Sequence, residues 1–247
     1  MENEGDAVLF ISELKLEKEA QKNWDRFYKR NSANFFKDRN WTKTEIELLC
    51  SDISLNSNLS FIDAGCGCGN TIFPLTKSFS NWNFYGIDFS KNAISLLEKR
   101  AEELDVKVQT RIFDLTLEDI QELNLPQVDI ISLVFVLSTI SKEGQKNVIK
   151  NIKKLLKPKG SIIVRDYGAY DHAMMRFGRN SKIDERFYVR QDGTRAYYFL
   201  IDELIKLFEE CGYTTFKCNY IYRRTENIKE GINFERTFVE GRFCKID

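Results

Sequence analysis

Short apolar runs alternate with longer amphipathic stretches through the middle of the chain. Five runs have the length of strands: 60–64, 82–87, 106–113, 128–134 and 161–165. The run 128–134 is apolar almost throughout, which is typical of a central parallel strand buried on both faces. The stretches 70–80, 90–104 and 142–156 have helical spacing, with Ser90 as N-cap of the second. Strands that alternate with helices predict right-handed crossovers and a doubly wound, Rossmann-like α/β domain.

Helical spacing also precedes the first strand. Helices are predicted over 12–31 and 42–51, the second with Thr42 as N-cap and Glu45 at the capping-box position. We therefore expect an N-terminal helical extension over 1–55.

The regular alternation stops after the fifth strand. Residues 166–199 show no clear period and are interpreted as an insertion. A helix at 201–211 and two late strands near 214–222 and 236–244 follow it. The main domain is expected to span 56–247.

Composition indicates an ordinary soluble globular protein. The 247 residues, 43% hydrophobic and 30% charged, form a chain long enough to fold without disulfide or metal staples. Six scattered cysteines are typical of reduced thiols in a cytoplasmic or nuclear protein. The polar, acidic start at 1–6 predicts no secretory signal, and no apolar run approaches the ~20 residues of a membrane helix.

Charge is balanced overall but clustered locally. The formal net charge of zero argues against a non-specific nucleic-acid coat. Residues 22–43 nevertheless hold seven basic and two acidic side chains, interleaved with aromatic ones, and residues 165–195 hold seven basic and five acidic. These clusters are either two solvated faces or a split basic surface for an anionic polymer, with aromatic side chains able to stack on bases.

The strongest chemical signal follows the first predicted strand directly. From Asp63 the chain runs through glycines at alternate positions, Gly65, Gly67 and Gly69, and then enters a helix. Glycines let a backbone turn tightly and approach a ligand. The G-x-G-x-G spacing differs from the dinucleotide fingerprint and resembles the first motif of S-adenosylmethionine enzymes. The alternative is a merely structural turn.

Polar residues end the next two strands. Asp88 ends the second, where a carboxylate can accept both ribose hydroxyls of an adenosine; the alternative is a helix N-cap. Asp114 ends the third strand, and by the same resemblance it would accept the adenine amine, with Leu115 packing beside it. The alternative is a loop aspartate. Val134 ends the fourth strand beneath the same crevice, a position that plain core packing also explains.

Aromatic side chains in the first helix supply a candidate lid. Trp24 and Tyr28 lie four residues apart and share one helix face. An aromatic face is a good neighbour for the sulfonium cation of S-adenosylmethionine. The alternative is a hydrophobic stripe that packs the helix on the domain.

The sequence lacks residues that several other reaction classes require. After the fourth strand the chain reads Phe135-Val136-Leu137-Ser138, without the Asn/Asp-Pro-Pro-aromatic motif of many enzymes that methylate base amines. No cysteine lies in the loops after strands four and five, which argues against cytosine-C5 chemistry. The single histidine and the isolated Cys66-x-Cys68 make a metal site improbable, so none is predicted.

The insertion offers a candidate acceptor site. Asp166 and Tyr167 fall at the carboxyl end of the fifth strand, where doubly wound folds bind substrates. Basic and aromatic residues follow at 170–172 and 187–195, and Asp192-Gly193 has the sequence of a hairpin turn.

These stretches together resemble one family. The matching segments are 21–29, 34–39, 64–67, 165–174 and 187–195. From about residue 18 onward the chain looks like the eukaryotic methyltransferase-like enzymes that make 3-methylcytidine in tRNA, and it looks closest to the branch acting on serine tRNA. It departs at Cys68, where a small aliphatic residue is expected.

The resemblance implies a fold, a cofactor, a substrate and a partner. The fold is the class I S-adenosylmethionine methyltransferase fold, with a seven-stranded sheet. The cofactor is S-adenosylmethionine, with S-adenosylhomocysteine as product. The acceptor is an anticodon-loop cytidine, position 32, of serine tRNA, with seryl-tRNA synthetase as partner and no DNA or membrane partner. Cofactor contacts are expected, with the first-motif Asp63 and Gly67, at Trp24, Tyr28, Gly65, Asp88, Asp114, Leu115 and Val134.

The chemistry of cytosine suggests how the acceptor side works. Cytosine N3 carries a lone pair and no proton, so attack on a sulfonium methyl needs no strong base. A carboxylate near N3 would stabilise the developing positive charge, and we nominate Asp166, with Asp171 second. The expected tRNA contacts are Lys22, Arg26, Lys29, Arg30, Arg165, Tyr167, His172, Tyr188, Arg190 and Arg195.

Two rival functions share some of these features. A class I methyltransferase for a protein or a small molecule would carry every cofactor motif. A non-catalytic binding subunit would have a degenerate cofactor pocket, against which the intact set from Asp63 to Asp88 argues.

Overall fold

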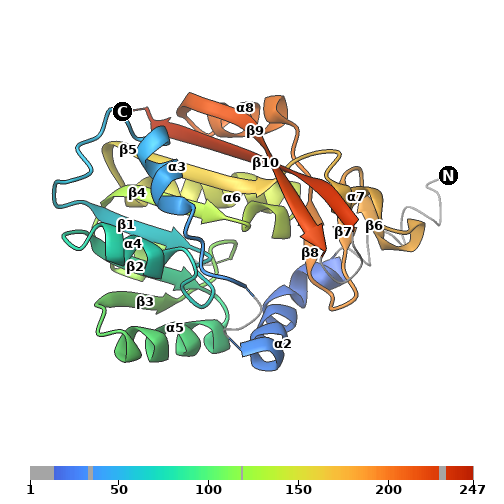
Figure 1. Cartoon of the computed structure of the whole chain (residues 1–247), viewed down its shortest axis with the longest axis horizontal. Helices are drawn as coiled ribbons and strands as arrows, with labels where there is room; N and C mark the ends of the chain where they lie inside the picture. The colour runs from blue at the N-terminus through green and yellow to red at the C-terminus, as the bar shows by residue number, and fades with distance from the viewer. Residues whose placement is uncertain (1–13, 33–35, 118, 228–231, 247) are drawn as a thin grey trace.

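A seven-stranded sheet forms the centre of the molecule in a computed structural model that describes residues 14–32, 36–117, 119–227 and 232–246 (Figure 1). The strand order is β3-β2-β1-β4-β5-β10-β9. The bounds are β1 (Ser60–Ala64), β2 (Asn83–Asp88), β3 (Val108–Ile112), β4 (Val128–Val134), β5 (Leu156–Tyr167), β9 (Tyr213–Asn227) and β10 (Ile232–Lys245).

The pairing confirms the predicted doubly wound sheet. Strand β1 pairs in parallel with β2 on one side and β4 on the other, so that Phe61 lies between Phe84 and Ile130. Strand β10 runs antiparallel between β5 and β9. The strand order therefore reverses between β1 and β4, and this switch point is where open α/β sheets bind their ligands.

Alternation of side chains along the strands divides the core between the two faces of the sheet. Phe61 and Ile130 pack into the cluster beneath α3 (Thr42–Leu49), α4 (Ile72–Ser78) and α5 (Lys91–Glu103). Their neighbours Ile62 and Ile131 pack into the opposite cluster. That cluster lies beneath α6 (Lys142–Ile152) and α8 (Ile201–Glu210). None of the helices in the described part of the chain is both long and apolar enough to span a membrane.

The helices before β1 are shorter than predicted and differently capped. Helix α2 spans Ala20–Asn31, preceded by helical residues at 14–18. The predicted capping box at α3 is wrong, because the helix begins after Trp41 without a side-chain cap. Thr42 instead donates its hydroxyl to the Arg39 carbonyl, and Glu45 is buried in an ion pair. By contrast, the cap at Ser90 is confirmed: its hydroxyl accepts from the Ala93 amide.

The insertion has more regular structure than its sequence indicated. It contains α7 (His172–Met175), the 3-10 turn η5 (Arg179–Ser181) and a sheet of three short strands, β6 (Lys182–Asp184), β7 (Phe187–Val189) and β8 (Arg195–Tyr197). Strands of three residues are too short for a period to show. The predicted helix 142–156 also ends early, at Ile152, because Leu156 already pairs with Val128 of β4.

Candidate cofactor and substrate site

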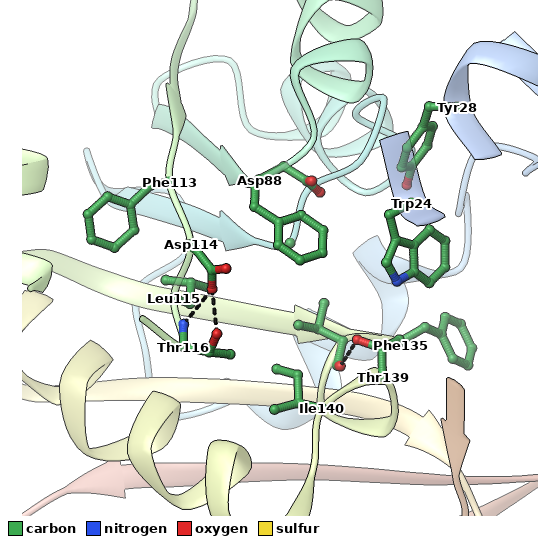
Figure 2. A pocket seen from close by; sticks show the side chains of 13 residues that line it. Trp24, Tyr28, Asp88, Phe113, Asp114, Leu115, Thr116, Phe135, Thr139 and Ile140 are labelled. Atoms are coloured by element: carbon green, nitrogen blue, oxygen red, sulfur yellow. Dashed lines mark hydrogen bonds between the residues drawn. The ribbon is translucent and has the colours of Figure 1, made fainter. Parts of the chain in front are cut away.

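A pocket opens at the carboxyl ends of the parallel strands, beneath α2 (Figure 2). The space within it, its open mouth included, is about 570 Å³, a size usual for small-molecule sites. It is lined by Trp24, Tyr28, Gly65, Asp88, Phe89, Phe113, Asp114, Leu115, Thr116, Phe135, Val136, Thr139 and Ile140. Six of the nine residues expected from sequence to contact the cofactor therefore line one cavity.

The glycine turn after β1 borders this pocket through Gly65 and leaves no room for side chains. Gly65 and Gly67 have φ values of +76° and +54°, which L-residues with a Cβ rarely adopt. A Cβ at Gly65 would lie 2.4 Å from Val136, and one at Gly67 would lie 2.4 Å from the Tyr28 hydroxyl. The backbone of the turn thus lies close against Val136 and Tyr28 of the pocket wall. The turn therefore shapes the pocket as well as connecting β1 to α4.

Asp88 ties the glycine turn to the start of α5. Its carboxylate accepts from the amides of Gly67 and Ser90, both at 2.9 Å. Burial raises the pKa of this carboxyl to about 6, despite those two hydrogen bonds. Because the side chain of Ser90 caps α5, Asp88 is left to line the pocket, where its contact with a ribose stays a prediction.

The loop after β3 lines the part of the pocket where the sequence predicts that adenine binds. Asp114 accepts from the amide of Thr116 at 2.8 Å and from its hydroxyl at 2.6 Å, which fixes the loop (Figure 2). Leu115 is buried beside it. Figure 2 shows Trp24 and Tyr28 entering the pocket from α2, across from this loop.

Helix α2 is fastened over the pocket rather than lying loosely beside it. Asp25 accepts from the Ser90 hydroxyl at 2.8 Å and from the Asn92 amide at 3.1 Å. The rings of Trp24 and Tyr28 are 6.1 Å apart, and Tyr28 is buried. Both residues therefore line the pocket and pack helix α2 on the domain, and their role as a lid over a cofactor stays a prediction.

A second cavity adjoins the first and has a more polar wall. It shares Trp24, Tyr28, Gly65, Phe135 and Thr139 with the first pocket. Its other lining residues are Phe27, Phe36, Arg39, Cys66, Asn70, Val134, Tyr167, Arg190, Asp192 and Thr194. Phe135 lies at the junction with φ +59°, a strained backbone of the kind found at functional sites. The cofactor-side and acceptor-side residues predicted from sequence meet here.

Asp63 lies deeper than the other cofactor candidates. Its side chain is buried and accepts from the Ser132 hydroxyl at 2.6 Å. Its second oxygen, Oδ2, has no hydrogen-bond partner among the described residues, and burial raises the pKa of the carboxyl. An unsatisfied acceptor beside the glycine turn fits a cofactor that carries an ammonium group.

The two nominated catalytic carboxylates are occupied by structural contacts. Asp166 is fully buried and accepts from the amides of Ser138 and Tyr167, both at 2.9 Å. Asp171 is also buried and forms an ion pair with Arg236 at 2.7 Å. Neither lines the two cavities. We therefore assign both to holding the loops around the site, and not to contact with an acceptor.

Two of the arginines predicted to bind tRNA are buried, and their prediction is wrong. Arg165 is 4% exposed and pairs with Glu45 at 2.9 Å and Glu240 at 2.6 Å. Arg195 is 3% exposed and pairs with Glu17. Guanidinium groups paired with carboxylates inside the fold are not available to phosphates.

The remaining candidate tRNA residues line or flank open surface. Lys22, Arg26, Lys29 and Arg30 are exposed on α2, Tyr167 and Arg190 line the second cavity, and half-buried Tyr188 and His172 stack on Phe177 and Phe234. A depression next to the second cavity is lined by Arg30, Arg176 and Arg190 together with Phe177 and Asp192. Arg176 here and Arg39 in the second cavity lie within the two basic clusters of the sequence, but neither was among the named site residues.

Comparisons with known proteins agree with this geometry. Residues 62–162 match the family model of a methyltransferase domain. The tRNA N(3)-cytidine methyltransferase METTL6 of Homo sapiens is 46% identical over 238 residues, which cover 95% of this chain and 84% of the relative. The tRNA N(3)-methylcytidine methyltransferase trm141 of Schizosaccharomyces pombe is 34% identical and is matched over 94% of this chain and 95% of its own.

The chain belongs to the tRNA N(3)-cytidine methyltransferase family. The family resemblance drawn from the sequence motifs is thereby confirmed. A solved S-adenosylmethionine-dependent methyltransferase of Anabaena variabilis has a TM-score of 0.69 to this chain, covering 92% of it and 95% of that chain at 14% identity. It shares the fold, which confirms the class I methyltransferase architecture expected for this family.

Proposed function

We propose that this protein transfers a methyl group from S-adenosylmethionine to N3 of a cytidine in tRNA. The observation that carries the proposal is identity of 46% to a human enzyme of that name over 95% of the chain. Such coverage includes the glycine turn, the lid helix and the insertion, and is not confined to the cofactor half that unrelated methyltransferases share.

The first pocket suits the adenosine part of this cofactor. Asp88 offers carboxylate oxygens to the ribose hydroxyls, and Asp114 with Leu115 forms the wall for the adenine ring. Trp24 and Tyr28 present aromatic faces, which attract a sulfonium cation. The cofactor supplies an electrophilic methyl group when bound, and these side chains orient it toward the second cavity.

The second cavity suits a flipped-out pyrimidine. The rings of Phe135 and Tyr167 lie 5.0 Å apart on its wall, and aromatic faces of this kind stack on bases. Arg190 lies over the Tyr167 ring at 5.6 Å and donates to the Arg195 carbonyl, which holds it at the cavity mouth. Since N3 carries its own lone pair, positioning can supply most of the effect, roughly 7–11 kcal/mol in favourable cases.

The surface around the cavities suits a loop of RNA. N3 of a paired cytosine is engaged, so the target must lie in a loop or be flipped out. Arg30, Arg176 and Arg190 line the adjoining depression, and no salt bridge joins any of them to another described residue. Their positive charges are therefore available to phosphates, and we expect tRNA binding to weaken steeply as salt rises.

The finer details of the substrate rest on the motifs shared with the serine branch. We propose position 32 of the anticodon loop of serine tRNA as the target and seryl-tRNA synthetase as a partner. DNA is not an expected substrate.

The decisive experiment supplies labelled S-adenosylmethionine and total tRNA, with and without seryl-tRNA synthetase, and analyses the nucleosides by mass spectrometry. The expected product is 3-methylcytidine in serine tRNA, in larger yield when the synthetase is present. An unmodified tRNA pool, with cofactor binding confirmed by calorimetry, would instead point to a protein or small-molecule acceptor. The Trp24→Ala variant is the control, because it removes an aromatic face that lines both cavities and leaves the basic residues of the outer depression in place.

A further inference from the structure

Arg39 places a guanidinium group inside the second cavity, beside the part of the wall that both cavities share. Its Nη1 donates to the Thr71 hydroxyl at 2.8 Å and reaches the Val134 carbonyl at 3.4 Å. The group also lies over the Phe135 ring at 5.1 Å. Its other nitrogens, Nε and Nη2, donate to no described residue.

The backbone around Arg39 is held in place by the end of the glycine turn. The Arg39 amide donates to the Asn70 carbonyl at 2.9 Å, and the Asn70 side chain donates to the Phe36 carbonyl at 3.0 Å. Asp38 forms an ion pair with Arg100 of α5 at 2.9 Å. The guanidinium is therefore preorganised toward the cavity by contacts that do not use its charge, and preorganised groups bind ligands at lower entropic cost.

The charge of Arg39 is not neutralised by the residues around it. Asp63 is a nearby acid, but no salt bridge joins the two within 4.0 Å in the described chain. Burial lowers the pKa of the guanidinium, which shows that its charge is partly desolvated. A desolvated cation with donors that face a cavity is stabilised most by an anion.

We propose that Arg39 binds the carboxylate of the methionine part of the cofactor. This inference rests on the proposed cofactor and adds a residue that recognises its amino-acid end. Asp88 and Asp114 hold the adenosine end in the first pocket, so the amino-acid part extends past Gly65 into the space where Arg39 lies. RNA phosphates are the other source of an anion, but exposed Arg30 and Arg176 meet them first on the outer surface.

The test compares two ligands in the absence of RNA. S-adenosylhomocysteine carries the carboxylate, whereas 5′-methylthioadenosine keeps the adenosine and sulfur and lacks the amino acid. Calorimetry would measure both affinities for the native protein, Arg39→Met, Arg39→Lys and the control Lys37→Met, an exposed cation two residues away. We expect Arg39→Met to weaken S-adenosylhomocysteine by about 30-fold, 5′-methylthioadenosine by less than twofold, and Arg39→Lys to recover part of the loss.

Three outcomes would overturn the proposal. Equal weakening of both ligands would assign Arg39 to the shape of the pocket, and unchanged affinity for both would remove it from the site. Loss of tRNA binding with unchanged S-adenosylhomocysteine affinity would assign its anion to RNA. Because no outcome requires methylation of tRNA, failure here is distinguishable from failure of the proposed reaction.

Discussion

The side-chain amide of Asn23 donates to the carbonyl of Gly193 at 3.2 Å and joins the lid helix to a turn of the insertion. Gly193 has φ +80°, and a Cβ there would lie 2.7 Å from the Asn23 amide nitrogen. The preceding residue, Asp192, lines the second cavity and the outer depression. One hydrogen bond therefore connects helix α2, which lines the first pocket, with the turn that lines the second cavity.

Breaking this connection should uncouple the two sites. S-adenosylhomocysteine should strengthen tRNA binding in the native protein, and we expect this enhancement to be smaller in Asn23→Ala. The enhancement should fall by about 3- to 10-fold, which corresponds to the free energy of one hydrogen bond. Titrations of tRNA with and without the cofactor product would measure it. The control is Asn31→Ala, which removes an amide that bonds only within α2. Full coupling in Asn23→Ala would mean that this hydrogen bond does not carry the coupling between the two sites.

Substitution of Gly67 should damage cofactor binding through Tyr28. Gly67→Ala adds a methyl group 2.4 Å from the Tyr28 hydroxyl and places alanine at φ +54°, which itself costs about 1–2 kcal/mol. We expect at least a tenfold loss of S-adenosylhomocysteine affinity by calorimetry. The double variant Gly67→Ala, Tyr28→Phe should regain part of it, because the hydroxyl is gone. If the double variant regains no affinity, the loss comes from backbone strain at residue 67 and not from the contact with the Tyr28 hydroxyl.

Cofactor affinity should depend on pH through Asp88. With its pKa raised to about 6, Asp88 is ionised above pH 6 and protonated below it. Protonation removes an acceptor from a carboxylate that already serves two backbone amides. Affinity should therefore fall as pH drops from 7 to 5. Asp88→Asn should bind weakly at every pH and show a flatter profile, whereas an unchanged profile would assign the titration to another group, such as Asp63.

The buried and exposed arginines should give opposite phenotypes. Among the described residues, Arg165→Met leaves Glu240 without a cation and Glu45 with only the exposed Arg223, and we expect a loss of about 3–5 kcal/mol in the free energy of unfolding, with little change in the salt dependence of tRNA binding. Its control is Arg223→Met, which removes an exposed ion pair to the same Glu45 and should cost at most about 1 kcal/mol. Thermal unfolding of the two variants would decide, and similar Tm values would contradict the burial argument.

Arg176→Ala should leave stability unchanged and weaken tRNA binding. The slope of log K against log salt should become shallower by about 0.7 for each single-strand phosphate that the variant no longer neutralises. Arg179→Ala is the matched control, because Arg179 is also exposed but does not line the depression. If both variants behave alike, the depression has no special part in binding.

The sequence predicted the sheet and the cofactor wall because both depend on local order. The glycine turn, Asp88 and Asp114 each lie at or just after the end of a strand, so knowing the strands places them at one edge of the sheet. Residues one position apart on a strand point to opposite faces, however, and a motif does not say which face is filled. Arg165 was misplaced for this reason: its partners Glu45 and Glu240 lie 120 and 75 residues away in the chain.

Roles that depend on contacts between distant parts of the chain were missed for a related cause. Arg39 lies in the matching segment 34–39, but its place at the second cavity depends on hydrogen bonds to Asn70, which the motif does not show. Asp166 was placed correctly at the end of β5, but its occupation by two amides depends on how the loop after β4 folds back. Such contacts become visible only in three dimensions.

The fastening of α2 has a consequence for the order of events during synthesis. Asn23 is synthesised 170 residues before Gly193, its hydrogen-bond partner. Asp25, by contrast, can form its hydrogen bonds to Ser90 and Asn92 as soon as the start of α5 has been synthesised. The half of the chain that forms the proposed adenosine pocket can thus assemble early, as domains commonly do during translation. A nascent chain should capture the cofactor product loosely at first and retain it only once the turn after β7 has been made.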